Sequence, residues 1–252
     1  MFEPYRWIED IANRREYIEE RLRGGSPVVG ISYEDGLLLL TTTKGGKKIF
    51  EIYDRIALSA IGHPADIEKL REIIIDAAHL EGFMRSPEDV TLRRLSTFVL
   101  APAMKQAFDE IFRSPYIARI MLAEIDRDGK ATFCRIDYDG SFQIREGFEV
   151  IGDTEESERA MREEAEGKGI GSASLPLEDA MREALRIWAK GKASGHQEEG
   201  PKDVADILSE ELGKAGRIEA SVLCKSLPTT SKFQELKEEE ISRMLEGIRD
   251  RI

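Results

Sequence analysis

The side chains most often used for nucleophilic, metal-binding or redox chemistry are sparse in this chain. Cys134 and Cys224 lie far apart in the sequence and lack the clustered spacing of a zinc site. Two cysteines are also too few for the disulfide framework of a small secreted domain, so both are interpreted as buried small hydrophobes. His79 lies between Ala78 and Leu80 and is interpreted as a half-buried structural histidine. We therefore assign no metal ligand and expect no cofactor.

One glycine-rich segment has the composition of a phosphate-binding loop. Residues 167–171 read GKGIG, but they follow a predicted helix rather than a strand, and the Gly-Lys-Ser/Thr ending is missing. We interpret the segment as a flexible connection and not as a nucleotide site.

The overall charge argues against nucleic acid and anionic membranes as partners. The chain has 37 basic and 49 acidic residues, and the net charge of −12 disfavours binding to nucleic acid or to an anionic membrane. Charged residues interrupt the N-terminal stretch where a signal peptide would be apolar, and the apolar runs are far shorter than the ~20 residues of a membrane-spanning helix. We expect a cytoplasmic protein.

The pattern of apolar residues predicts strands and helices in alternating blocks. A polar helix over 9–22 carries only a thin apolar stripe, so we expect it to pack against something other than the main core of its own chain, with a partner surface as one option. Antiparallel strands are predicted over 27–32, 37–43, 47–53 and 56–61, with Asp35-Gly36 as a hairpin turn. A helix over 65–83 follows, then a second over 88–111 that Pro102 should bend.

The second half repeats this order. Strands are predicted over 116–125, 131–138 and 142–150, forming a second sheet, and helices over 155–166 and 177–190. Residues 191–203 are interpreted as a surface excursion, followed by a short helix over 204–212, a strand over 218–223 and a closing helix over 238–252. The order predicts an α/β (α+β) fold, a four-layer αββα sandwich with an extra N-terminal helix.

The local sequence adds a family resemblance to this fold. Residues 24–73, from GGSPVVGISYEDG to HPADIEKLREI, resemble the opening of a proteasome subunit, a family of the N-terminal-nucleophile (Ntn) hydrolase superfamily. The resemblance continues in 136–143 (IDYDGSFQ), 149–157 (EVIGDTEES) and 176–191 (PLEDAMREALRIWAKG). The start, MFEPYRWIEDIANRREYIEERLRGGSP, is similar to bacterial α subunits of the actinobacterial kind. The resemblance implies one domain over 1–252, with a gate segment and helix in 1–24 and the sandwich core in 25–252.

The resemblance also addresses catalysis. Catalytic β subunits of the family lack the leading helix and are processed so that a threonine becomes the N-terminus, whose amine acts as base for its own hydroxyl. The matching position here is Ser26, the position of the family's acid is Thr42, and only the basic partner is retained, as Lys48. We therefore expect no catalytic residue in this chain.

The retained lysine has a second role in the α subunits that the chain resembles. There it lies in a pocket between neighbouring subunits and pairs with the C-terminal carboxylate of an activating AAA ATPase. The resemblance implies that Lys48, with Gly25 and Gly62 as pocket-lining glycines, forms this pocket. The alternatives are a solvated lysine at a strand edge and two turn glycines, and His63 departs from the aliphatic residue common in the family.

Phe2, Pro4 and Tyr5 match the start of the bacterial gate segment, where N-termini converge over the axial pore. The alternative for these residues is a frayed chain end. The loop before Ser114 lacks the paired glycines of archaeal α subunits, so no pore residue is assigned.

The function implied is a non-catalytic α subunit of a bacterial 20S proteasome. Its expected partners are further copies of itself in a heptameric ring, separate β subunits, a regulatory ATPase ring and unfolded protein substrates. Two alternatives stay open at the level of sequence: a self-contained homomeric serine- or threonine-type Ntn peptidase processed at Ser26, and a repurposed scaffold without a β partner.

Overall fold

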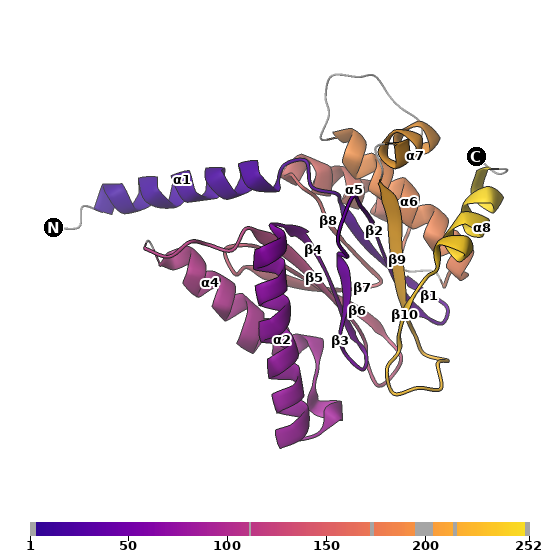
Figure 1. The fold of residues 1–252 in the computed structure, drawn as a ribbon, viewed down its shortest axis with the longest axis horizontal. Coiled ribbons are helices and arrows are strands. Elements are labelled where there is room, and N and C mark those ends of the chain that lie inside the picture. The colour runs from indigo at the N-terminus through magenta and orange to yellow at the C-terminus, as the bar shows by residue number, and fades with distance from the viewer. Residues whose placement is uncertain (1–3, 111, 172–173, 195–203, 214–215, 250–252) are drawn as a thin grey trace.

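Two antiparallel sheets form the centre of the molecule (Figure 1). The computed structural model describes residues 4–110, 112–171, 174–194, 204–213 and 216–249. The first sheet has the strand order β10-β9-β2-β1-β8 and the second the order β3-β4-β5-β6-β7. The strands are β1 (Val28–Tyr33), β2 (Gly36–Thr43), β3 (Ile49–Tyr53), β4 (Ile56–Gly62), β5 (Ala118–Ile125), β6 (Ala131–Ile136), β7 (Phe142–Glu146), β8 (Phe148–Ile151), β9 (Arg217–Cys224) and β10 (Phe233–Glu235).

Helices cover the outer face of each sheet, which confirms the predicted αββα sandwich (Figure 1). The second sheet is covered by α2 (Pro64–Met84), η1 (Pro87–Asp89), α3 (Leu92–Leu95), η2 (Ser96–Leu100) and α4 (Ala101–Asp109). The first sheet is covered by α5 (Glu155–Gly167), α6 (Leu177–Ser194), α7 (Val204–Gly213) and α8 (Glu238–Arg249). Each sheet shares an apolar cluster with its helices, and a third cluster lies between the sheets. None of the helices in the described ranges is long and apolar enough to cross a membrane.

The N-terminal helix α1 (Pro4–Leu22) corrects one prediction. It begins at Pro4 rather than at residue 9, and proline is tolerated in a first helical turn because its nitrogen needs no partner there. Ile18 and Leu22 are fully buried and belong to the cluster between the sheets, so the expectation that the stripe avoids the main core was wrong for the last turns. A thin stripe suffices because only this end enters the core, while the opposite half extends beyond the sheets (Figure 1).

The predicted blocks of strands do not each form a sheet. β3 and β4 belong to the second sheet, where β4 pairs with β5, and not to the sheet of β1 and β2. The single strand predicted over 142–150 divides at Gly147 into β7 and β8, which lie in different sheets. Gly147 has a φ of +83°, a conformation that other residues rarely adopt, and this turn carries the chain from one sheet to the other.

The predicted helix over 88–111 is interrupted. It consists of η1, α3, the π-helical turn η2 and α4, with Pro102 in the first turn of α4. Proline has no N–H for the hydrogen bond to the preceding turn, and the wider π turn lies directly before it. The structure also contains the short strand β10, which the sequence did not predict because three residues show no periodicity.

Candidate functional site

Ser26 lies buried at the point where α1 meets the first sheet. Its side chain is 7% exposed, and its Oγ lies 2.8 Å from Thr42 Oγ1. The same oxygen accepts hydrogen bonds from the Thr42 amide at 3.2 Å and from Trp188 Nε1 at 3.1 Å. In the described part of the chain these partners, with Thr41, are donors or hydroxyls and none is a base. The arrangement fixes a strand start and cannot activate a nucleophile.

Lys48 lies half-buried just before β3, in a cluster of charges. Burial lowers the pKa of its ammonium to about 8, and the positive charge of Lys192 acts in the same direction, as does that of Lys44. The carboxylates of Glu219 and Glu211 oppose this shift. Within the described ranges, the Lys48 side chain forms no hydrogen bond or ion pair. A partly desolvated ammonium without a direct partner favours an incoming anion.

Glu219 on β9 fixes the backbone of this cluster. Its carboxylate accepts the Lys48 amide at 3.0 Å and the Ile49 amide at 2.9 Å. Lys192, near the end of α6, donates to the Gly25 carbonyl at 3.3 Å. Lys192, which is distant in sequence, therefore interacts with both Gly25 and Lys48 and marks them as neighbours in the fold.

Gly25 and Gly62 meet through Ile61. A Cβ at Gly25 would lie 2.5 Å from Ile61 Cγ2, and one at Gly62 would lie 2.0 Å from the Ile117 carbonyl oxygen. Gly62 also has a φ of +143°. Packing inside the subunit thus requires glycine at both positions, whatever else they line. His63 caps α2 by accepting the Ala65 amide on Nδ1 at 3.3 Å.

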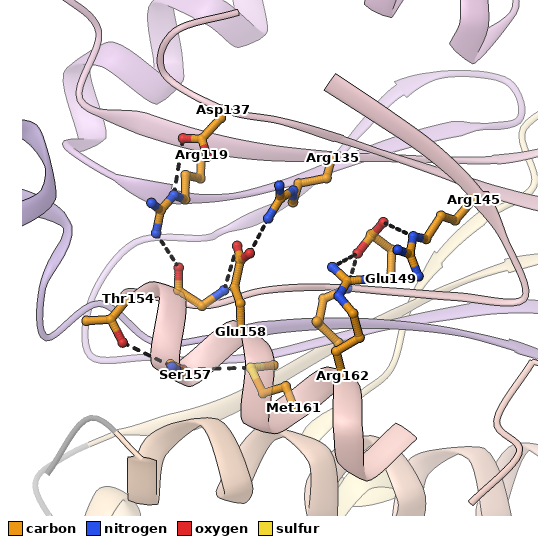
Figure 2. A network of polar contacts seen from close by, with 12 residues as sticks. Arg119, Arg135, Asp137, Arg145, Glu149, Thr154, Ser157, Glu158, Met161 and Arg162 are labelled. Atoms are coloured by element: carbon orange, nitrogen blue, oxygen red, sulfur yellow. Dashed lines mark hydrogen bonds and ion pairs between the residues drawn. The ribbon is translucent and has the colours of Figure 1, made fainter. Parts of the chain in front are cut away.

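A second group of charges lies between the two sheets on the side of α5 (Figure 2). Arg119 pairs with Asp137 at 3.2 Å and Glu19 at 2.6 Å, and Arg135 pairs with Glu158. Burial raises the pKa of Glu158, against the opposing charge of Arg135. The network joins α1, β5, β6 and α5, so we interpret it as structural. The described residues contain no cluster of His, Cys, Asp and Glu that could hold a metal ion.

Comparison with known proteins identifies the family. The family described as "Proteasome subunit" matches residues 22–195. A "Proteasome subunit alpha" from Actinosynnema mirum is 30% identical over 239 residues, covering 94% of this chain and 84% of the relative. One from Rhodococcus erythropolis is 32% identical over 242 residues (88% and 91%), and one from Frankia casuarinae 30% over 200 residues (78% and 80%).

The chain belongs to the proteasome subunit family. Its relatives are named alpha subunits, which confirms the prediction of a non-catalytic alpha-type subunit and does not favour the self-contained peptidase. Ser26 is buried, and none of its hydrogen-bond partners among the described residues is a base, which agrees with this assignment.

The structure places the remaining predicted site residues only in part. Pro4 and Tyr5 form the first turn of α1, and Phe2 lies outside the described residues. The gate assignment therefore stays a prediction, as does the docking assignment of Lys48, Gly25 and Gly62.

Sequence reasoning missed three members of the Lys48 cluster. Glu219, Lys192 and Glu211 lie more than a hundred residues after Lys48 and occupy β9, α6 and α7. No local motif marks them, because each is one charged residue among many in the second half of the chain.

Proposed function

We propose that this proteasome alpha subunit forms an outer heptameric ring that stacks on a ring of separate β subunits, admits unfolded proteins through its N-terminal segment, and docks a regulatory ATPase at Lys48. Peptide bonds are cut in the β chamber, at the N-terminal threonines of the β subunits. The chain supplies access control.

The observation that best supports ATPase docking at Lys48 is its half-buried ammonium, which lacks a direct partner in the described part of the chain. A C-terminal carboxylate is the complementary group, because it supplies one charge on a segment narrow enough to enter a pocket. Gly25 supports the same assignment, because Lys192 donates to its carbonyl and also acts on Lys48 through its charge.

Assembly is supported by an exposed apolar patch on the outer helix layer. Leu80, Phe83 and Met84 on α2 are 59%, 91% and 71% exposed, and Phe98 on η2 is 72% exposed. Arg94 links the two elements, since it pairs with Glu81 at 2.8 Å and lies over the Phe98 ring. Large apolar side chains gathered on one surface are typical of a subunit contact.

Co-expression with a candidate β subunit tests the proposal. We expect peptide hydrolysis only with both chains, a four-ring barrel by electron microscopy, and an intact mass that retains residues 1–25. Lys48→Ala should abolish stimulation by the ATPase while leaving hydrolysis of small peptides unchanged. A protein that begins at Ser26 and hydrolyses peptides alone would contradict the assignment.

A further inference from the structure

Helix α7 lies over the end of the first sheet at which β9 begins (Figure 1). It belongs to the excursion after α6, whose role the sequence left unexplained. Val204, Ile207 and Leu208 pack against the apolar cluster between the first sheet and its helices. The helix is therefore fixed to the body of the subunit by its apolar face.

Glu211, in the last turn of α7, pairs with Lys44, one of the lysines whose charge acts on Lys48. Its Oε1 lies 3.3 Å from Lys44 Nζ, and its side chain is only 13% exposed. The Gly216 amide donates to the Glu211 carbonyl at 3.3 Å, and this hydrogen bond holds the end of α7 against the residue before β9. Glu211 also stabilises the charged form of Lys48.

The two carboxylates of this cluster differ in what holds them. Glu219 accepts the backbone amides of Lys48 and Ile49, so it has a fixed structural role. Glu211 forms an ion pair with Lys44 and acts on Lys48 through its charge, and among the described residues its carboxylate accepts no backbone amide. It is thus the carboxylate that an external carboxylate replaces most easily.

We propose that Glu211 is an internal competitor for the lysine pocket, which weakens the binding of a partner's C-terminal carboxylate and so sets the affinity of docking. The inference rests on the proposed docking function. Its physical basis is that a nearby carboxylate lowers the positive potential at Lys48, and this potential attracts the incoming anion.

Replacing Glu211 with glutamine tests the idea, because the amide keeps the shape and removes the charge. The probe is a fluorescein-labelled ten-residue peptide with an apolar C-terminal residue and a free carboxylate, and its C-terminally amidated twin is the comparison. Binding to assembled rings of the full chain is measured by anisotropy at physiological salt. We expect Glu211→Gln to bind the free-acid peptide about threefold to tenfold more tightly, with no change for the amide.

Two further variants test whether the effect of Glu211→Gln on affinity is local, rather than a result of the change in net charge or of misfolding. Asp206→Asn removes the same charge from an exposed position of α7 and should leave affinity within about twofold of wild type. Lys44→Gln removes the lysine paired with Glu211 at a largely exposed position, so it should weaken binding of the free acid. Lys44→Gln and Glu211→Gln should thus change the affinity for the free-acid peptide in opposite directions, and Lys44→Gln is expected to fold because Lys44 is largely exposed.

The outcomes distinguish the inference from the function on which it rests. If Glu211→Gln binds like wild type, or Asp206→Asn tightens binding equally, or Lys44→Gln tightens it, the competitor role is wrong. If no probe binds wild-type rings, or Lys48→Ala binds the free acid as tightly as wild type does, the docking function itself is wrong.

Discussion

Lys48, the residue that we propose docks the ATPase, should also lower the stability of the folded chain. Its ammonium is half-buried, and burial lowers its pKa to about 8 from an ordinary value of 10.5. At neutral pH the lysine is charged in both the folded and the unfolded chain, and the folded chain bears the cost of desolvation. Between about pH 8 and 10.5 the folded chain loses its proton first, so the unfolded chain binds more protons and stability rises with pH.

Replacing Lys48 with methionine should remove this cost. We expect Lys48→Met to raise the free energy of unfolding by about 1–3 kcal/mol at pH 7, with the gain shrinking between pH 8 and 10.5. Urea unfolding at a series of pH values measures it. Lys47→Met is the matched control, because Lys47 is exposed and pairs with Glu235 at 2.5 Å, so its effect should stay small. A gain that does not depend on pH would contradict the explanation.

The same residue marks how far the sequence could predict the site. Lys48, Gly25 and Ser26 belong to a continuous N-terminal segment whose residue order is informative. Lys192 and Glu211 reach the cluster only because α6 and α7 pack over the first sheet. That arrangement is a tertiary property, and a charged residue in a charged helix carries no local signal of it.

At the scale of elements, the sequence predicted positions well and sheet membership poorly. The hairpin of β1 and β2 and helices α2, α5 and α6 lie close to their predicted ranges. β3 and β4 were placed in the wrong sheet because both sheets are covered on both faces, so their strands have similar apolar sequences, and the partner of each strand depends on packing. The division at Gly147 was missed because a glycine within an apolar run does not by itself indicate a change of sheet.

Gly147 offers a test of that turn. Its φ of +83° disfavours a side chain, and a Cβ would lie 2.6 Å from the Gly171 Cα. We expect Gly147→Ala to lower the free energy of unfolding by about 1–3 kcal/mol, measured by urea unfolding.

Gly167→Ala is the matched control for this variant. Gly167 ends α5, and apart from its chain neighbours and the backbone of its own helix no atom of the described residues lies within 4 Å of the Cβ that would be added. Because alanine favours a helix, this variant should be neutral or more stable by up to about 1 kcal/mol. If Gly147→Ala and Gly167→Ala change the free energy of unfolding equally, the turn at Gly147 does not require glycine.

At the scale of the whole molecule, the two ends of α2 lie at surfaces of different character. Gly62 and His63 lie directly before α2, close to the proposed docking site, whereas Phe83 and Met84 end the same helix. A helix of 21 residues spans about 30 Å, so the apolar patch lies far from the docking site. The proposed docking site and the apolar patch that we propose as a subunit contact therefore lie near opposite ends of α2.

A charge in this patch should prevent assembly without unfolding the subunit. Phe83 is 91% exposed, so Phe83→Glu removes almost no contact within the chain and should leave the unfolding midpoint unchanged. In a particle that covers the patch, the buried carboxylate would lack a partner, and this should reduce complete particles at least tenfold. Size-exclusion chromatography and electron microscopy of chains co-expressed with a β subunit measure the loss. Phe83→Tyr is the conservative control, because it keeps the ring and should assemble normally; full assembly of Phe83→Glu would place the subunit contact on another face.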